Sequence, residues 1–500
     1  MPTRRRRRPD RPPLSVPPLR ILFATPECAP LVKTGGLGDV AAALPVALRQ
    51  TGLDVRMLLP GYPAVLAALA GARVAGQIDA VARLPSARLL EAELPTGVPV
   101  WIVDCPQLYD RGGSPYQDAV GADWPDNPLR FGLLSRAAAM IASPQSPLKW
   151  RPQVVHANDW QTGLAPAYSS LAYGGSPPSI ITVHNLAFQG VFAPHWVADL
   201  ALPAASFAVD GVEYYGRLSF LKAGLFYADA ITTVSPSYAK EIQTEAMGAG
   251  MHGLLAARRD RLTGILNGID TTVWDPATDA LITERYDART LERKAVNKKA
   301  LQKRLGLEPR EDVPLLGAVT RLTEQKGIDF LLDIADRVLS LPAQIAVVAS
   351  GDKALEQRLM ALTAARPDLA ASFIGFDETL AHLVEAGADA FVMPSRFEPC
   401  GLNQMYSQRY GTPPIVHATG GLVDSVVDCT PPTVADGTAT GFKFFAPNAE
   451  ALMGAIERCA VAYSDAEVWR ALQRNGMARD FSWNAAAREY GAIYARLIAS

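Results

Sequence analysis

A lysine followed by closely spaced glycines is the first stretch of the chain that could do chemistry. The segment Lys33-Thr34-Gly35-Gly36-Leu37-Gly38-Asp39 comes after the apolar run Ile21–Ala24 and before a predicted helix, Val40–Gln50. Glycines let a ligand approach the backbone, and unpaired N–H groups at the start of a helix attract anions. The spacing matches neither the dinucleotide pattern nor the Walker phosphate-binding pattern. These residues alone therefore fit either an anion site that includes Lys33 or a tight structural turn.

Arg321 and Lys326 form a second charged motif, between a predicted strand and a helix predicted over 328–339. Two cations around a turn at a helix start suit a diphosphate, which Arg321 can bind with two parallel hydrogen bonds. An exposed charged turn is the alternative. Further along the chain, Thr419-Gly420-Gly421 offers more unpaired N–H groups at the start of another predicted helix.

Glu398 lies in Ser395-Arg396-Phe397-Glu398-Pro399, directly after the predicted strand Ala390–Met393. Its aromatic neighbour and the following proline restrict where the carboxylate can lie. A fixed carboxylate in a cleft can hydrogen-bond sugar hydroxyls or stabilise positive charge that develops at an anomeric carbon. The alternative is a surface glutamate held in an ion pair.

Two histidines and a polar stretch mark the first half of the chain. His156 and His184 each follow a predicted strand, in HANDW and HNL, and neither has a carboxylate or cysteine at metal-ligand spacing, so we predict no metal site. Such histidines are often structural, but both are expected to face the cleft that holds Lys33. A stretch that could bind a sugar polymer, or form a plain surface loop, contains Tyr116, Asp126, Asn127 and Arg130.

The elements that must position these residues alternate along the whole chain. Short apolar runs such as Val55–Leu59, Ile180–Val183, Leu315–Val319 and Ile345–Ala349 are followed by helical stretches. This alternation predicts an α/β fold with parallel sheets, in which ligands bind beyond the carboxyl ends of the strands. A glycine-rich, weakly periodic segment at 245–265 predicts a boundary between two such units, with a cleft between them.

Composition excludes several classes of protein. The chain is 49% hydrophobic and 20% charged, which is typical of a globular protein of two or more domains. The first 13 residues carry six arginines and one aspartate, which leaves a net charge near −7 on the rest of the chain. We therefore predict a disordered basic tail and no nucleic-acid-binding surface. No apolar run approaches the ~18 residues of a membrane span. Five scattered cysteines predict a cytoplasmic protein without a disulfide framework or a zinc site.

The ordered motifs of the chain resemble those of bacterial-type glycogen (starch) synthases, which are retaining glucosyltransferases with the two-lobed GT-B architecture. The matches run in family order from about residue 20 to about residue 490. They are PECAPLVKTGGLGDV (26–40), LLPGYP (58–63), LYDRGGSPYQD (108–118), DWPDNPLRFGLLSRAA (123–138), VVHANDWQTGLAPAY (154–168), TVHNLAFQG (182–190), SFLKAGL (219–225), ITTVSPSYAKEI (231–242), GILNGID (264–270), RLTEQKG (321–327), PSRFEPCGLNQMY (394–406), TGGLVDSV (419–426) and FSW (481–483).

This resemblance implies two Rossmann-like parallel-sheet domains that face a central cleft. An acceptor-side domain would cover 20–260 and a nucleotide-sugar domain 261–480. The Arg/Pro-rich tail would cover 1–19, and a C-terminal helix over 481–500 would return to the first domain.

The resemblance also implies a hexosyltransferase that moves glucose from ADP-glucose to the non-reducing end of an α-1,4-glucan, glycogen or a maltooligosaccharide, in glycogen biosynthesis. It would retain the α configuration and need no metal or other cofactor. Carried over by motif position, Arg321 and Lys326 would neutralise the leaving diphosphate, and Glu398 would hold glucose hydroxyls and support the oxocarbenium-like transition state. His184 would line the glucose site, and Asp159 would lie close to the acceptor. The implied substrate-binding residues are Lys33, Gly35, Gly36, Tyr116, Asn267, Phe376, Cys400, Gly401, Leu402 and Thr419.

Three positions depart from the family pattern. Phe376 stands where familiar members have tyrosine, so ring stacking on adenine should survive but a hydroxyl contact would not. Asn158 and Gln161 replace histidines that are common there, on the acceptor side.

Other classes of protein share part of this pattern. A GT-B enzyme that uses UDP-glucose or makes sucrose would keep Arg321, Lys326 and Glu398, but should lack the KTGGLGD loop. A non-hydrolysing sugar-nucleotide epimerase shares the architecture but would need no glucan. A non-catalytic glucan-binding homologue predicts damaged motifs, whereas the motif residues are all present.

Overall fold

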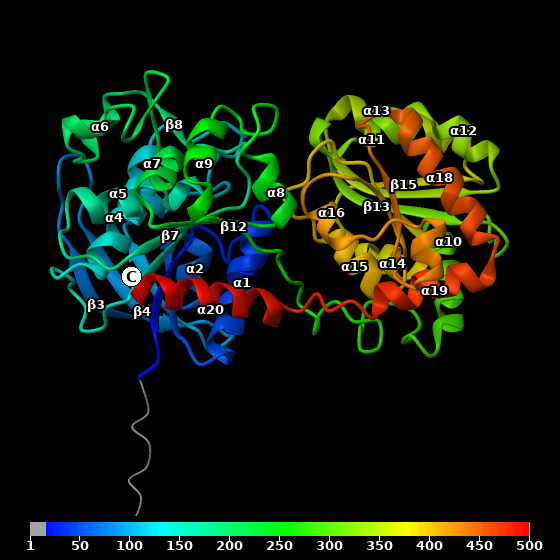
Figure 1. Ribbon diagram of the computed structural model, residues 1–500, viewed down its shortest axis with the longest axis horizontal. Helices are drawn as coiled ribbons and strands as arrows, with labels where there is room; N and C mark the ends of the chain where they lie inside the picture. Colours follow the sequence, from blue (N-terminus) through cyan, green and yellow to red (C-terminus); the bar gives the residue numbers. More distant parts are fainter. Residues whose placement is uncertain (1–16, 500) are drawn as a thin grey trace, which may run out of the picture.

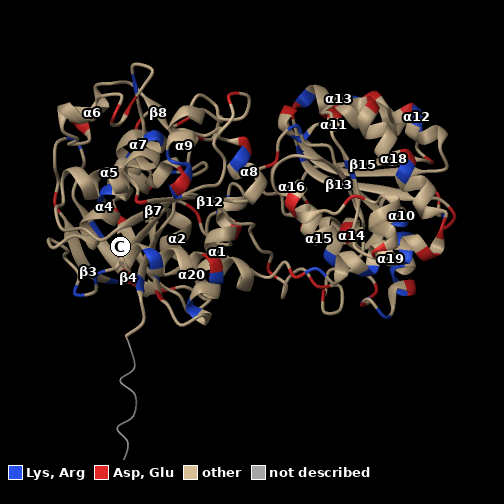
Figure 2. Ribbon diagram, in the orientation of Figure 1, with Lys and Arg blue, Asp and Glu red and all other residues tan. Residues whose placement is uncertain are grey.

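Two α/β lobes lie side by side in the computed structural model, which describes residues 17–499 (Figure 1). Residues 1–16 of the predicted tail lie outside the described residues. The two lobes have separate sheets, as the sequence predicts. Figure 2 shows acidic and basic residues interspersed over both lobes.

Nine strands of the described chain form the sheet of the N-terminal lobe, in the order β12-β11-β7-β6-β1-β2-β5-β4-β3. Their bounds are β1 (Arg20–Ala24), β2 (Asp54–Pro60), β3 (Arg73–Ile78), β4 (Ala87–Glu93), β5 (Pro99–Asp104), β6 (Val154–Asn158), β7 (Ser179–Val183), β11 (Ala230–Thr233) and β12 (Leu262–Gly264). From β12 to β5 all neighbours pair in parallel. In this parallel part the carboxyl ends of β1, β6 and β7 lie at one edge, which brings their following loops together.

Two features of this sheet differ from the sequence prediction. β3 and β4 pair antiparallel at one edge. The sequence does not predict this edge because β3 is largely exposed and so lacks the apolar run of a buried strand. β12 also continues the N-terminal sheet past the predicted boundary at residue 260, because a three-residue edge strand gives little sequence signal.

The helices of the N-terminal lobe cover this sheet, and α1 begins directly after the glycine loop. They are α1 (Gly36–Gln50), α2 (Pro63–Ala68), α3 (Pro106–Tyr109), α4 (Asn127–Ala142), α5 (Leu164–Leu171), α6 (Trp196–Asp199), α7 (Phe220–Tyr227), α8 (Pro236–Glu241) and α9 (His252–Ala257). A small antiparallel sheet contains β8 (Val191–Phe192), β9 (Glu213–Tyr214) and β10 (Arg217–Ser219).

The C-terminal lobe contains, within residues 17–499, a six-stranded parallel sheet in the order β15-β14-β13-β16-β17-β18. Its strands are β13 (Leu315–Leu322), β14 (Gln344–Gly351), β15 (Ala370–Ile374), β16 (Ala390–Met393), β17 (Pro414–His417) and β18 (Phe442–Phe444). The helices around it are α10 (Lys294–Leu305), α11 (Ile328–Asp333), α12 (Ala335–Ser340), α13 (Lys353–Ala365), α14 (Glu378–Gly387), α15 (Asn403–Arg409), α16 (Gly420–Ser425), α17 (Pro431–Ala435), α18 (Ala449–Tyr463) and α19 (Ala466–Met477). β13 and β16 are neighbours, so the loops with Lys326 and Glu398 leave the sheet side by side.

The last helix, α20 (Trp483–Ala499), packs on α1 and β6 of the N-terminal lobe (Figure 1). Its Tyr494 hydroxyl lies 2.7 Å from His156 Nδ1, inside the core of that lobe. The chain therefore crosses between the lobes a second time before it ends.

Helices α8 and α16 join the two lobes next to the candidate site. Asp424 of α16 accepts hydrogen bonds from the Ser237 N–H and hydroxyl, at 2.8 and 2.7 Å. In return, Glu241 of α8 accepts one from the Gly420 N–H at 2.8 Å. None of the helices in residues 17–499 is both long and apolar enough to span a bilayer.

Candidate active site

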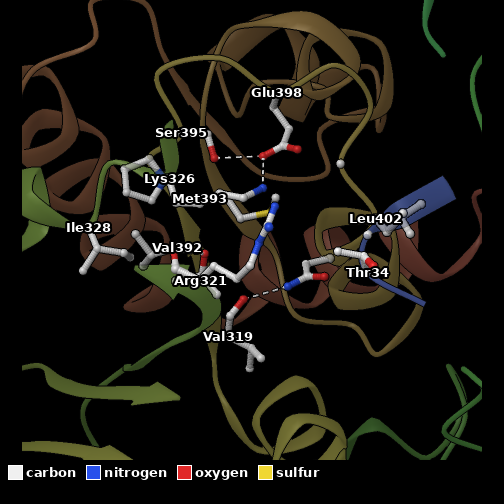
Figure 3. A pocket seen from close by; sticks show the side chains of 16 residues that line it. Thr34, Val319, Arg321, Lys326, Ile328, Val392, Met393, Ser395, Glu398 and Leu402 are labelled. Carbon is white, nitrogen blue, oxygen red and sulfur yellow. Dashed lines mark hydrogen bonds and ion pairs between the residues drawn. The ribbon is translucent and has the colours of Figure 1, made fainter. Parts of the chain in front are cut away.

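A pocket of about 210 Å³ lies between the glycine loop of the N-terminal lobe and the strand ends of the C-terminal lobe (Figure 3). Of the residues singled out from the sequence, the pocket is lined by Gly35, Gly36, Arg321, Lys326, Glu398, Gly401 and Leu402. Residues without an earlier role also line it, among them Thr34, Ser395 and Asn403. The structure thus brings the glycine loop together with two motifs of the C-terminal lobe, Lys326 and Glu398 being 72 residues apart in sequence.

Glu398 and Lys326 form an ion pair in the wall of this pocket. Lys326 Nζ lies 2.7 Å from Glu398 Oε2, and the Ser395 hydroxyl donates to the same oxygen at 3.0 Å (Figure 3). Glu398 is almost fully buried, so it is not the exposed surface glutamate that the sequence left open. Its carboxylate is held in one orientation by a cation and a hydroxyl.

Local backbone geometry explains why the two loops meet. Gly327 has a φ of +66°, and a Cβ there would lie 2.1 Å from the Pro394 carbonyl oxygen. Only glycine combines this left-handed conformation with such a close approach. Arg396 strengthens the contact through a bidentate ion pair with Asp329 at 2.6–2.8 Å.

Arg321 leaves the end of β13 with an exposed side chain and, within residues 17–499, no acidic partner. In Figure 3 its side chain and that of Lys326 extend into the same pocket. The adjoining wall is fixed because the Asn403 amide donates to the Val319 carbonyl at 2.8 Å. An unpaired guanidinium beside a lysine is a suitable binding group for a diphosphate.

The glycine loop is held from behind by an acidic side chain. Glu27 Oε2 accepts hydrogen bonds from the Thr34 N–H at 2.5 Å and the Gly35 N–H at 3.2 Å. These two N–H groups are therefore not free for an anion, contrary to the simplest interpretation of the loop. Lys33 does not line the pocket, and its ammonium group is 2.7 Å from Asp39.

The ends of β6 and β7 bring His184 and Asp159 together. The Asp159 carboxylate accepts from the His184 N–H at 2.7 Å, and His184 Nε2 lies 2.9 Å from Asn158 Oδ1. Burial raises the pKa of Asp159 to about 7 and lowers the pKa of His184 to about 3. Asp159 also has a φ of +55°, a strained conformation for a non-glycine residue that is concentrated at functional sites.

Two expectations for the first half were wrong. His156 lies inside β6 and contacts Tyr494 and Thr182, so it is a core residue that does not face the cleft. Arg130 is fully buried and donates to the carbonyls of Leu108 and Pro115, so it is neither a sugar-binding group nor part of a surface loop.

Tyr116 of the same polar stretch does lie close to the glycine loop. Its hydroxyl donates to Glu27 Oε1, and its ring contacts those of Phe131 and Trp160. Asp126 forms an ion pair with Arg111 at 2.9 Å, and the Asn127 amide donates to the Tyr116 carbonyl. The hydrogen bond from Asn127 thus helps to hold the backbone of Tyr116 in place.

The remaining predicted residues occupy different surroundings. The side-chain oxygen of Asn267 is buried without a partner in residues 17–499. The backbone N–H of the same residue donates a hydrogen bond to the Cys400 sulfur. Burial raises the pKa of Cys400 to about 12, so this thiol is not a nucleophile. The Thr419 hydroxyl lies 3.3 Å from Glu241, and Phe376 is 78% exposed, outside the pocket.

Sequence reasoning assigned no role to Ser395, Glu27 or Glu241, which hold the predicted groups in place. All three lie inside motifs given above, but the contacts of Glu27 with Tyr116 and of Glu241 with Gly420 join residues that are distant in sequence, so nothing in the motifs shows them. Residues 17–499 contain no group of three or more His, Cys, Asp or Glu side chains arranged to hold a metal ion. All five cysteines are free.

Comparisons with known proteins agree with this geometry. The family model described as starch synthase catalytic domain matches residues 20–257, and glycosyl transferases group 1 matches 301–471. A glycogen synthase of Aromatoleum aromaticum is 58% identical over 96% of this chain and 98% of its own length. The catalytic domain of starch synthase IV from Arabidopsis thaliana, solved with ADP and acarbose, is 32% identical and superimposes with a TM-score of 0.84 over 97% of this chain and all of that one. A sucrose-phosphate synthase of Thermosynechococcus elongatus, at 20% identity, a TM-score of 0.58 and 96% and 99% coverage, shares the fold alone.

Proposed function

The chain belongs to the glycogen and starch synthase family of glucosyltransferases, and we propose that it transfers glucose from ADP-glucose to the non-reducing end of an α-1,4-glucan with retention of configuration. The observation that carries the proposal is the single pocket in which Arg321, Lys326, Glu398 and the glycine loop meet. The ADP in the Arabidopsis structure supports an adenine nucleotide as the carrier of the glucose.

Departure of the diphosphate is the step that this pocket favours most. As the bond from glucose C1 to the phosphate oxygen breaks, negative charge grows on the diphosphate, and Arg321 and Lys326 are in place to stabilise it. The glycine loop adds backbone N–H groups from the opposite lobe. We propose that these groups replace a metal ion, so that the reaction needs no cofactor.

Glucose would lie next to Glu398. A carboxylate held by Lys326 and Ser395 can accept hydrogen bonds from sugar hydroxyls and stabilise the positive charge that develops at C1. Asn267, with its unpaired side-chain oxygen, and His184 would complete the glucose site.

The acceptor would approach from the side of Asp159 and Tyr116. Its O4 forms a bond with C1 on the face that the diphosphate leaves, and the O4 proton passes to a phosphate oxygen of ADP. We favour this front-face transfer because the backbone N–H of His184 engages the Asp159 carboxylate and Lys326 and Ser395 engage the Glu398 carboxylate, so neither group is free to act as a nucleophile. Trapping of a glucosyl ester on Asp159 or Glu398 would overturn this mechanism.

The proposed function is tested by incorporation of glucose into glycogen from ADP-glucose and UDP-glucose in parallel, with and without EDTA. We expect transfer that strongly favours ADP-glucose, is unchanged by EDTA and is lost in Glu398→Ala. Transfer from UDP-glucose alone would overturn the donor, and inhibition by EDTA would overturn the metal-free mechanism. No transfer from either donor would favour a non-catalytic glucan-binding protein. The free cysteines support our further proposal of a cytoplasmic location.

A further inference from the structure

Glu27 is a buried acidic residue that the mechanism above does not use. It follows β1 and is 3% exposed. A turn around Thr25 fixes its backbone, because the Thr25 hydroxyl donates to the Glu27 carbonyl at 3.0 Å. Burying a carboxyl group is costly unless hydrogen bonds compensate it. The hydrogen-bond partners of the Glu27 carboxylate therefore indicate the role of this residue.

Both carboxylate oxygens of Glu27 are used, each toward a different part of the site. Oε2 accepts from the N–H groups of Thr34 and Gly35, at 2.5 and 3.2 Å, and Oε1 accepts from the Tyr116 hydroxyl. The space around Oε2 is filled, since a Cβ on Gly38 would lie 3.4 Å from it and 3.0 Å from Lys33 Cγ.

These contacts decide which N–H groups of the loop remain for a ligand. With Thr34 and Gly35 turned toward Glu27, the next two N–H groups, of Gly36 and Leu37, donate to no protein acceptor in residues 17–499. They lie in the first turn of α1, where N–H groups lack partners within the helix. Thr34, Gly35 and Gly36 line the pocket opposite Arg321.

The contact with Tyr116 reaches the other side of the site. The Tyr116 ring packs against Trp160, which directly follows Asp159. One carboxyl group thus joins the loop that faces the donor pocket to the wall that carries Asp159.

We propose that Glu27 is a positioning residue that holds the Lys33–Gly36 loop and the Tyr116 side chain in the arrangement needed for glucose transfer. The inference rests on the proposed function. Arg321 and Lys326 in the opposite lobe would hold ADP, whereas the loop N–H groups act on the charge that grows on the diphosphate during transfer, so loss of Glu27 should slow transfer much more than it weakens ADP binding. A displacement of about 1 Å can cost about 10²-fold in rate, even when the substituted residue is far from the reacting atoms.

The test compares Glu27→Ala, Glu27→Gln and Tyr116→Phe with the wild type and with Glu93→Ala, an exposed glutamate at the end of β4. We measure kcat with ADP-glucose and glycogen, the Kd of ADP by calorimetry, and deuterium exchange in a peptide over residues 28–40. In Glu27→Ala we expect kcat to fall about 10²-fold, the ADP Kd to stay within about twofold, and the peptide to exchange faster. In Glu27→Gln, which keeps one acceptor oxygen, kcat should fall less than in Glu27→Ala. In Glu93→Ala kcat should not change.

Unchanged kcat in Glu27→Ala would overturn the proposal, as would exchange in the 28–40 peptide equal to that of the wild type. Parallel losses in kcat, ADP affinity and melting temperature would assign Glu27 a purely structural role and also overturn it. If Glu27→Ala does not fold, kcat and deuterium exchange in the 28–40 peptide are measured for Glu27→Gln and Tyr116→Phe instead. Values equal to those of the wild type would then overturn the proposal. If the wild type itself transfers no glucose, the proposed function fails, whereas deuterium exchange still shows whether Glu27 holds the loop.

Discussion

Lys326 Nζ lies 2.7 Å from Glu398 Oε2, although 72 residues separate the two in sequence. Their side chains are 19% and 8% exposed, so the pair is largely shielded from water. Each charge compensates the other in the pocket. A diphosphate that binds Lys326 would therefore compete with Glu398 for its ammonium group, while the Ser395 hydroxyl keeps the carboxylate oriented.

Substitution of either partner should reduce catalysis strongly. We expect Lys326→Ala and Glu398→Gln each to lower kcat about 10²- to 10³-fold, as loss of a preorganised charge or donor does elsewhere. Because the two residues act as a pair, the double variant should lose less than the product of the two single losses. A matched control is Lys353→Ala, which breaks another Lys–Glu pair at 2.7 Å, on an exposed lysine, and should leave kcat unchanged. Fully multiplicative losses would contradict the coupling.

Arg321 should determine the affinity for the nucleotide. Its guanidinium is unpaired in the described chain, so Arg321→Ala should weaken ADP binding about 10- to 10²-fold, the range for loss of a hydrogen bond to a charged group. Arg321→Lys should keep only part of the affinity for ADP, because lysine cannot bind a phosphate with two parallel hydrogen bonds. Calorimetry with ADP measures the affinity of both variants, and Arg470→Ala, in α19 and outside the pocket, is the control. Equal affinity in the wild type and Arg321→Ala would show that this residue does not contact the diphosphate.

The stability of the N-terminal lobe should depend on pH through Asp159. Burial raises its pKa to about 7 in the folded chain, well above its unfolded value. Folding therefore favours the protonated form, and this contribution is full below the unfolded pKa and is lost as pH rises through about 7. We expect the wild type to lose up to a few kcal/mol of unfolding free energy between about pH 4 and 7, relative to Asp159→Asn. Urea unfolding of both proteins across this range measures the difference; parallel curves would show that the Asp159 pKa is unshifted.

Tyr494 should stabilise the fold without taking part in catalysis. Its hydroxyl is a partner of the buried His156, whose pKa burial lowers to about 3, so the imidazole stays neutral. Tyr494→Phe leaves one ring nitrogen unsatisfied, which costs about 1–3 kcal/mol of unfolding free energy. Tyr215→Phe, on an exposed tyrosine, is the control. A decrease in kcat with unchanged stability would contradict this assignment.

The sequence predicted the part of the site that follows from strand order. Lys326 and Glu398 each follow an apolar strand, and parallel strands place such loops at one edge, so their meeting could be expected. Their direct ion pair could not, because it depends on the side-chain geometry of two loops that only the folded chain brings together.

Other contacts could not be predicted from the sequence. Arg130 looked like a surface cation because its carbonyl partners, at Leu108 and Pro115, are set by the path of a distant loop. Glu27 has no motif spacing to Tyr116, since the hydrogen bond spans 89 residues. The antiparallel strand β3 was missed because its side chains are largely exposed, and apolar periodicity reports only burial.

The central claim is tested most directly by the product of a single addition to a defined maltooligosaccharide. Incubation of the purified protein with ADP-glucose and maltoheptaose should release one ADP for each glucose added, and an exo-acting α-glucosidase should remove the new terminal residue. This result would establish transfer to the non-reducing end with retention. Free glucose with no extended chain, or a terminal residue that only a β-glucosidase removes, would contradict the account.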